Sequence, residues 1–266
     1  MSTITIPAID VHAHYGTYKR DEFPPLSNEL FSGDAATVAH RAAECNVTTT
    51  VVSPLLGLLP RGQADAAEGN EEAARIVPAT DGLLQWVIVD PRNPRTYEQA
   101  EAMLQQPHCV GIKIHPEEHV YFIGEYAREI FAFAARFDAV VLTHSGHVHS
   151  LPADIVPFVN DHPNVRLILA HIGCSEGFDR TLQVRGIQMA RHDNVYADTS
   201  SMNSISPRLI EWAVKEVGAE KILFGTDTPL YYTAMQRARI DHADLADATK
   251  KMILRDNAEK LLGIEG

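Results

Sequence analysis

Short apolar runs alternate with helix-like stretches along the whole chain, and this alternation restricts its fold more than any other feature. Eight runs bounded by turn residues are predicted to be strands: Ile4 to His14, Val47 to Ser53, Leu84 to Asp90, Val110 to His115, Val140 to His144, Arg166 to His171, Val195 to Thr199 and Ile222 to Asp227. Six stretches between or after them carry helical spacing or helix-start signals: Asp34 to Glu44, Ala64 to Val77, Pro94 to Leu104, Glu125 to Phe137, Pro207 to Val217 and Leu245 to Leu262.

This order of elements predicts an α/β protein. Strands rich in Val, Ile and Leu that alternate with helices pair in parallel, with both sheet faces covered. Eight such units in 266 residues match a (β/α)8 TIM barrel. A doubly wound open sheet is the alternative, but the chain has no GxGxxG or GxxxxGK[ST] phosphate turn. With no shift of composition to mark a linker, we expect one domain over residues 1–266. Three polar stretches are predicted to be loops: Tyr15 to Gly33, Gly57 to Gly62 and Gly146 to Pro152.

Composition excludes several kinds of partner. Asp and Glu number 35 against 23 Lys and Arg, a net charge of −12, so we expect neither nucleic acid nor a membrane surface as a partner. The apolar runs are far shorter than the roughly 20 residues of a membrane span. Residues 1–9 lack the pattern of a secretory signal, and three widely spaced cysteines, Cys45, Cys109 and Cys174, argue against a disulfide framework. A cytoplasmic protein is therefore expected.

The first predicted strand ends in an Asp-x-His-x-His pattern. Because strand side chains alternate between faces, Asp10, His12 and His14 are expected to point the same way. Two imidazoles that converge in this manner can hold a metal ion. Two partly exposed loop histidines are the alternative. Asp10 is expected either to orient His12 or to form another buried hydrogen bond.

Three other predicted strands also end in candidate ligands. The fifth ends in His144, the sixth in His171 and the eighth in Asp227. In a parallel barrel the C-terminal ends of all strands lie on one rim, where barrel enzymes carry their active sites. Packing alone does not explain His or Asp at the end of each apolar run, because burying an unpaired polar group is costly. The pattern favours a metal site at the C-terminal rim.

Six motifs together carry a family resemblance: Asp10-Val11-His12-Ala13-His14, Gly111-Ile112-Lys113-Ile114-His115-Pro116, His144, Leu169-Ala170-His171-Ile172-Gly173, Leu223-Phe224-Gly225-Thr226-Asp227-Thr228-Pro229 and Asn257-Ala258-Glu259-Lys260-Leu261-Leu262-Gly263. The chain resembles the amidohydrolase superfamily over almost its whole length, and specifically the amidohydrolase-2 branch of metal-dependent TIM-barrel hydrolases and decarboxylases. The resemblance implies a catalytic divalent metal, zinc or alternatively manganese. It implies His12, His14, His144 and Asp227 as ligands and His171 beside the metal, as a further ligand or an oxygen-binding group.

The same resemblance suggests roles for these residues. Zinc lowers the pKa of a bound water toward about 7, and Asp227 would accept the proton of that water and pass it on. His171 would stabilise the oxygen on which charge develops. Lys113 is either a carboxylated bridge between two metals, as in binuclear relatives, or a free ammonium group that binds a substrate carboxylate, which we favour. His115 and Arg92 are weaker candidates for substrate contacts.

Residues near the ends of other predicted strands are less informative. Asp198 is expected to line the pocket or to form ordinary strand-end hydrogen bonds. His147 and His149 contact substrate or lie solvated in a loop. Cys174 is interpreted as a packing residue, because no base is arranged to activate it as a nucleophile.

Three functions fit these patterns. The leading hypothesis is a metal-dependent hydrolase that acts on a small-molecule ester, lactone or amide. The alternative is a non-oxidative decarboxylase of an aromatic or unsaturated acid, which would use the same ligands. A non-catalytic metal-binding barrel is the third. The expected partner is a small-molecule substrate. The amphipathic outer helices could also pack against a second copy of the chain in a homo-oligomer.

Overall fold

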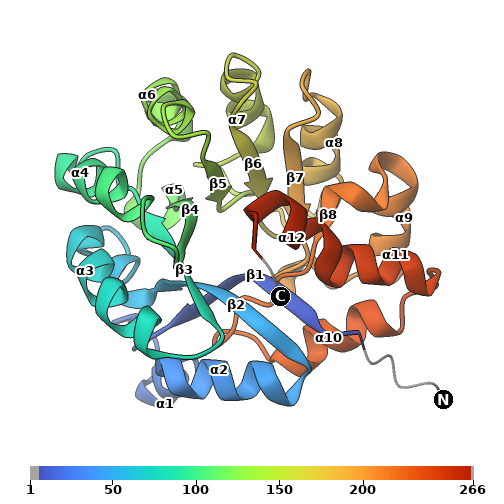
Figure 1. Ribbon diagram of the computed structural model, residues 1–266, viewed down its shortest axis with the longest axis horizontal. Coiled ribbons are helices and arrows are strands. Elements are labelled where there is room, and N and C mark those ends of the chain that lie inside the picture. Colours follow the sequence, from blue (N-terminus) through green and yellow to red (C-terminus); the bar gives the residue numbers. More distant parts are fainter. Residues whose placement is uncertain (1–5, 265–266) are drawn as a thin grey trace.

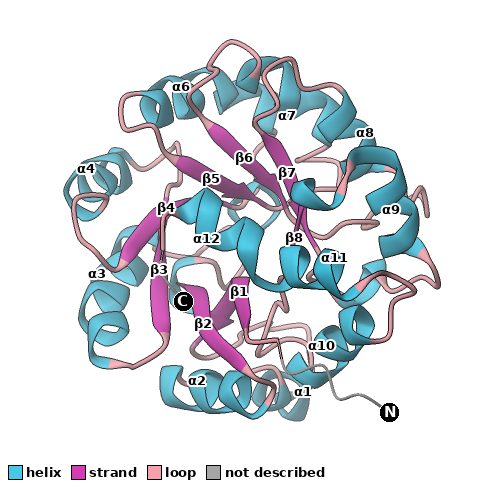
Figure 2. Ribbon diagram, turned by 45° about the vertical axis from the view of Figure 1, so that its right-hand side comes forward, coloured by secondary structure: helices cyan, strands magenta, loops and turns pink. Residues whose placement is uncertain are grey.

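The computed structural model describes residues 6–264, so the predicted start of the first strand at Ile4 and the predicted absence of a signal segment at residues 1–5 lie outside it. Eight parallel strands follow one another in the sheet in chain order. They are β1 (Ala8–Tyr15), β2 (Val47–Pro54), β3 (Leu83–Ile88), β4 (Cys109–Ile114), β5 (Val140–Thr143), β6 (Arg166–Leu169), β7 (Val195–Asp198) and β8 (Ile222–Leu223). Figure 2 shows them as a ring inside a layer of helices, which confirms the predicted (β/α)8 barrel.

Backbone hydrogen bonds close the barrel between its first strand and the segment that follows its last. The amide of Val11 donates to the carbonyl of Phe224 at 2.9 Å, and the amide of Asp227 donates to the carbonyl of His12 at 2.7 Å. The amide of His14 reaches the carbonyl of Thr228 at 2.7 Å. The first strand and the segment after the last strand therefore meet, and the closure places Asp227 beside His12.

Helices cover the outside of the ring (Figure 1). They are α1 (Pro25–Leu30), α2 (Ala35–Glu44), α3 (Ala66–Ile76), α4 (Pro94–Met103), α5 (Pro116–His119), α6 (Ile123–Ala135), α7 (Pro152–Val159), α8 (Leu182–Gln188), α9 (Leu209–Val217), α10 (Thr233–Asp241), α11 (Asp247–Lys251) and α12 (Asn257–Leu262). The cap predicted at Asp34 is present, because its carboxylate accepts from the amide of Thr37 at 2.7 Å. The first predicted loop was wrong in part, since it contains α1, where a proline opens a short helix.

The last predicted helix is continuous but irregular. Between α11 and α12 the segment Met252–Asp256 is a π-helical turn. This turn is buried against the barrel through Ile253 and Leu254, and the carbonyl of Ile253 accepts from the amide of Phe224. The spacing of hydrophobic residues does not predict a π-helical turn, because this turn depends on its contacts with the barrel, such as the hydrogen bond from Phe224.

An apolar cluster fills the barrel below the rim: Ile9, Val11, Val51, Trp86, Val140, Leu142, Ile168, Ala170, Leu223, Ala258 and Leu261. Its last two members belong to α12, and the Leu261 carbonyl accepts from Arg166 at the start of β6. Helix α12 therefore closes the N-terminal end of the barrel, which leaves the opposite rim for the polar residues.

Strand β1 departs from the simple alternation that its sequence predicts. Its pairing with β2 shifts register between Asp10 and Ala13, where β1 contains one residue more than its partner. Before the shift, Ile9 and Val11 point into the barrel. After it, Ala13 packs outward against α2 and α3.

The prediction that Asp10 shares a face with the two histidines is therefore wrong. Asp10 Oδ1 accepts from the backbone amides of His12 and Thr226, each at 3.0 Å, and Asp10 makes no contact with the His12 ring among the described hydrogen bonds. Burial raises the pKa of Asp10 to about 8. Asp10 therefore joins the backbone of β1 to the segment after β8 and does not orient a ligand side chain. None of the described helices is long and apolar enough to cross a membrane.

Candidate metal centre and its cavity

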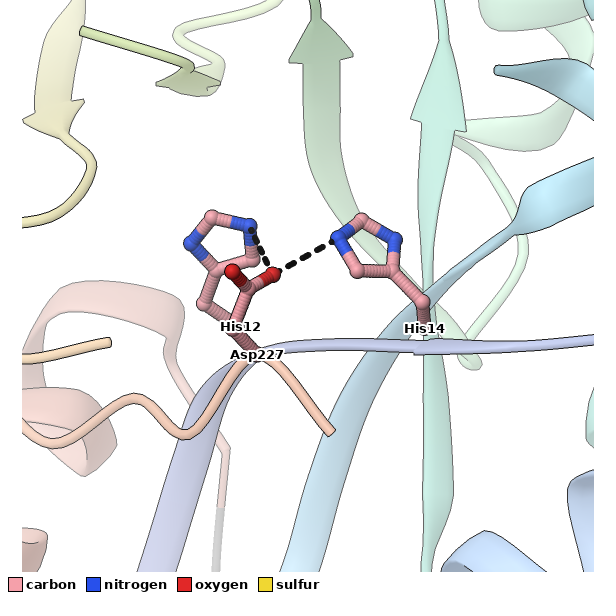
Figure 3. A group of neighbouring side chains, drawn as sticks. All are labelled: His12, His14 and Asp227. Atoms are coloured by element: carbon pink, nitrogen blue, oxygen red, sulfur yellow. Dashed lines mark ion pairs between the residues drawn. The ribbon is translucent and has the colours of Figure 1, made fainter. Parts of the chain in front are cut away.

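Three buried side chains converge at the C-terminal rim of the barrel. His14 Nε2 lies 3.1 Å from Asp227 Oδ1, and His12 Nε2 lies 3.7 Å from the same oxygen (Figure 3). One ligand atom from each residue lies within 4.8 Å of the other two. Two imidazoles and one carboxylate form a donor set that suits zinc, manganese and related divalent ions.

The second nitrogen of each imidazole fixes the direction in which the ring points. His12 Nδ1 lies 2.9 Å from Asp198 Oδ2, and His14 Nδ1 lies 3.1 Å from the carbonyl oxygen of Ser53. Because both oxygens accept, we assign the ring hydrogen to Nδ1 in each histidine. The Nε2 lone pairs of both rings then face Asp227. Three acceptors directed at one another are stable around a cation, so the residues fit a bound metal.

Electrostatics at the centre agree with this assignment. Burial lowers the pKa of His14, which therefore stays neutral. Burial opposes the ionisation of Asp227, but its contact with His14 and the neighbouring imidazoles outweigh burial and hold its pKa well below the ordinary value. Burial also opposes the ionisation of Asp198, but its interactions with His12, His171 and Ser200 together outweigh burial and lower its pKa. Neutral imidazoles and ionised carboxylates are the forms that bind metals.

His171 and His144 extend the cluster to one side. His171 Nε2 lies 3.1 Å from His144 Nδ1, and His144 Nε2 lies 2.7 Å from His147 Nδ1. His171 Nδ1 contacts the Ser200 hydroxyl at 2.7 Å. Burial lowers the pKa of His171 to about 3. The structure thus joins His144 to the centre through His171, and it does not gather His144 into the same group as His12, His14 and Asp227.

Two site residues have a backbone conformation that is unusual for residues with a side chain. His171 has φ of +67° and Asp227 has φ of +61°, both in the left-handed region. This region costs a non-glycine residue about 1–2 kcal/mol. Each follows the end of a strand, β6 or β8, and the turn aims its side chain toward the barrel axis. Strain of this kind is concentrated at functional sites, where surrounding contacts enforce it.

A cavity of about 380 Å³ opens beside these groups. Its polar lining includes His14, His115, His144, His147, His171, Asp227, Arg20, Arg61, Glu117 and Glu118. Its apolar lining includes Leu55, Leu58, Leu59, Leu230 and Tyr231. A cavity with metal-type donors, an apolar wall and a few charged groups is typical of a small-molecule site.

Two arginines of the cavity wall share one carboxylate. Arg20 and Arg61 both contact Glu118, with 3.2 Å between Arg61 Nη2 and Glu118 Oε1. The Arg20 side chain is only 12% exposed. Two guanidinium groups here share one carboxylate, while Glu117 and Glu176 also line the cavity. The N–H groups of Arg20 and Arg61 that do not bind Glu118 are suitable donors for a substrate carboxylate, because guanidinium groups bind carboxylates with two parallel hydrogen bonds.

The three predicted substrate contacts lie in different surroundings. His115 lines the cavity, where its ring stacks on His144 with centroids 4.5 Å apart and its Nδ1 accepts from the amide of Glu118. Lys113 points inward, as predicted, and is fully buried with its Nζ 2.9 Å from His12 Nε2. Arg92 pairs with Asp90 through Nε and Nη2, at 3.1 and 3.0 Å, and is not among the described residues that line the cavity.

Sequence reasoning missed the charged wall. Arg20 lies in the first predicted loop, Tyr15 to Gly33, and Arg61 in the second, Gly57 to Gly62. Both loops follow barrel strands and therefore lie at the C-terminal rim. Their basic residues could for this reason have been proposed as part of the site. The position of Glu118 at the site could not be predicted in this way, because it lies in α5, a four-residue helix that the sequence pattern did not predict.

The fold and the donor group together define a metal-centre barrel of the α/β class. A family model described as "Amidohydrolase" matches residues 9–264, and the chain belongs to this amidohydrolase-2 family. A comparison with curated protein sequences gave no match. The family is one of enzymes, which agrees with the resemblance seen in the sequence motifs.

Solved structures share the fold at low identity. The 5-carboxyvanillate decarboxylase from Sphingomonas paucimobilis is 12% identical, with a TM-score of 0.75, and the match covers 98% of this chain and 100% of that one. The 2,6-dihydroxybenzoate decarboxylase from Rhizobium is 16% identical, with a TM-score of 0.72 and coverage of 98% and 99%. A dihydroxybenzoic acid decarboxylase from Polaromonas, solved with manganese and 2-nitroresorcinol, is 16% identical, with a TM-score of 0.73 and coverage of 97% of each chain.

Proposed function

We propose that the protein is a metal-dependent, non-oxidative decarboxylase of a small aromatic or unsaturated carboxylic acid. The observation that carries the proposal is the cavity itself, which places a group of metal-type donors, His12, His14 and Asp227, in the same space as the guanidinium groups of Arg20 and Arg61. The names of the structural relatives support this alternative over the hydrolase that headed the sequence-based hypotheses.

Each group has a role in such a reaction. His12, His14 and Asp227 would hold the ion, with His144 as the further ligand that the family resemblance implies. A bound divalent ion, manganese or zinc, would bind and polarise oxygen atoms of the substrate. The guanidinium groups of Arg20 and Arg61 would orient an anionic group, and the leucines on the apolar wall would contact a ring or an alkene.

The chemical step breaks the bond between the carboxyl carbon and its neighbour. Carbon dioxide leaves, and the electron pair stays on the neighbouring carbon, which gains a proton. We assign Asp227 as the proton carrier, because its carboxylate lies both at the centre and on the cavity lining. Asp227 is ionised in the resting protein, so it would first take up the acidic proton of the substrate and then pass it to this carbon. His171 is neutral because of burial and donates its Nδ1–H to Ser200, whose hydroxyl donates to Asp198, so its Nε2 would accept a hydrogen bond from a hydroxyl group of the substrate.

The decisive experiment measures the release of carbon dioxide. Protein loaded with manganese or zinc is incubated with hydroxylated benzoic acids and unsaturated acids labelled with ¹³C at the carboxyl carbon. Release of labelled carbon dioxide by the native protein, and its loss in Asp227→Asn, would support the proposal. Parallel assays use aryl esters, lactones and amides. Hydrolysis of one of these without decarboxylation would instead establish the hydrolase, and inactivity on every substrate class would favour the non-catalytic barrel.

A further inference from the structure

Lys113 contacts the same His12 nitrogen that a metal would use. His12 Nδ1 faces Asp198, so the free lone pair of the ring lies on Nε2 and is directed toward Asp227. Lys113 Nζ lies 2.9 Å from this Nε2, within hydrogen-bond distance. An amine donates to an imidazole lone pair in either of its protonation states. One lone pair binds either an N–H donor or a metal ion, but not both.

Among residues 6–264, the hydrogen bonds give the Lys113 amino group one partner, the His12 ring. The side chain extends from the C-terminal end of β4 into the barrel and is fully buried. Among the described residues its hydrogen bond is to His12, and the nearby carboxylates of Asp227 and Asp198 attract its charge without contacting it closely enough to form an ion pair. Lys113 therefore occupies the position on the ring from which His12 would coordinate a metal.

We propose that Lys113 is an internal competitor of the metal, which weakens metal binding by holding His12 Nε2. Binding of an ion to His12, His14 and Asp227 requires the Lys113 amine to leave His12 and to turn toward the adjoining cavity. Lys113 thereby sets the metal affinity of the centre. The inference rests on the metal site of the proposed function but not on the reaction, because its test measures affinity and not turnover.

The competing interpretations of Lys113 predict the opposite sign. If Lys113 carried a carboxylate that bridged two ions, its removal would lower metal affinity and reduce the number of ions bound. If it only bound a substrate carboxylate, its removal would leave metal affinity unchanged. A measurement of metal affinity therefore separates the three roles in one experiment.

The test compares native protein with Lys113→Met, which keeps most of the side-chain volume and removes the donor. After treatment with a chelator, each protein is titrated with Mn²⁺, and free Mn²⁺ is followed by electron paramagnetic resonance. We expect the dissociation constant of Lys113→Met to fall by about tenfold, the factor that corresponds to one hydrogen bond from a charged donor. The matched control is Lys250→Met, which removes another buried lysine, one that donates to the Asp241 carbonyl away from the centre, and should leave the affinity unchanged.

An unchanged or larger dissociation constant in Lys113→Met, while the native protein binds Mn²⁺, overturns the role of Lys113 alone. Absence of binding in both proteins overturns the metal site, and with it this inference. Should Lys113→Met fail to fold, a crystal structure of the manganese-loaded native protein decides the question. Movement of Lys113 Nζ beyond hydrogen-bond distance of His12 Nε2 supports the competition, and retention of that contact refutes it.

Discussion

At the scale of single residues, the centre depends on side chains that bind no metal themselves. Asp198 fixes the His12 ring, accepts from the backbone amide of His171 at 3.1 Å and accepts from the amide of Ser200 at 2.9 Å. One buried carboxylate thus positions two of the histidines. The sequence placed Asp198 at the end of a strand, but its partners come from β1 and from the turn after β6, which no local pattern connects.

Asp198→Ala is expected to weaken Mn²⁺ binding by about 10- to 100-fold, the usual effect of removing a group that orients a metal ligand. The reason is that His12 loses the acceptor that fixes its tautomer and ring direction. The measurement is the Mn²⁺ dissociation constant, with Asp179→Ala as a control that removes an exposed aspartate bonded to Thr181. Equal affinity in the two variants would show that Asp198 does not orient His12.

A substitution of Arg20 tests whether the cavity wall formed by Arg20, Arg61 and Glu118 binds the substrate. Arg20→Met should raise the KM for a carboxylate substrate by about tenfold or more while kcat changes less, because a charge-assisted hydrogen bond to the substrate is lost. Arg95→Met, which removes a half-exposed arginine paired with Glu71, should leave both constants unchanged. A fall in kcat at constant KM would contradict a binding role for Arg20.

The thiol of Cys109 is expected to make the stability of the protein depend on pH. Burial raises the pKa of its thiol from 9.0 to about 12. Between these values the unfolded chain releases a proton that the folded chain keeps, so the contribution of this thiol to stability is present below pH 9 and declines as the pH rises above it. In urea denaturation at pH 8 and pH 10, Cys109→Ala should lose less stability than the native protein. Parallel losses in the two proteins would count against a protected thiol.

At the scale of secondary-structure elements, most of the barrel could be predicted and its irregular parts could not. Hydrophobic runs located the eight strands, while the Asp34 cap, an Ala/Glu-rich stretch and an opening proline located α2, α3 and α4. The register shift in β1, the π-helical turn and the short helices α1 and α5 depend on contacts between distant segments. The strand-end histidines were predictable because strand ends define the rim. The sequence could place Arg20 only in a loop beside that rim, because the contacts that aim it at Glu118 depend on the loop, for example on Asn28.

Two glycines, one in β4 and one in α6, offer substitutions with opposite expected effects on stability. A Cβ at Gly111 would lie 2.3 Å from the carbonyl oxygen of Val140 and 2.6 Å from the Trp86 ring, whereas a Cβ at Gly124 in α6 would meet nothing within 4 Å. Gly111→Ala should therefore lower the free energy of unfolding by about 1–3 kcal/mol through overpacking. Gly124→Ala should raise it by up to about 1 kcal/mol, because alanine favours a helix. Urea denaturation measures both, and a stable Gly111→Ala variant would show that β4 can shift away from β5.

At the scale of the whole molecule, the metal centre exists only when the barrel is closed. His12 and His14 come from the first strand and Asp227 from the segment after the last, which are joined by the hydrogen bonds that seal the ring. More than 200 residues of chain separate these ligands. An unfolded chain therefore cannot present the centre, and an ion that binds there must stabilise the closed barrel.

This coupling predicts a thermal shift. At a free Mn²⁺ concentration about 100 times its dissociation constant, binding adds about 2.7 kcal/mol to stability. For a chain of this size that corresponds to a rise in Tm of about 5–10 °C, which a chelator should reverse. Because Asp227→Asn removes the only carboxylate in the group of His12, His14 and Asp227, its Tm should respond to Mn²⁺ much less. Calorimetry of both proteins at the same scan rate measures the two shifts in Tm. Equal shifts would mean that the ion binds elsewhere and that closure of the barrel does not assemble its site.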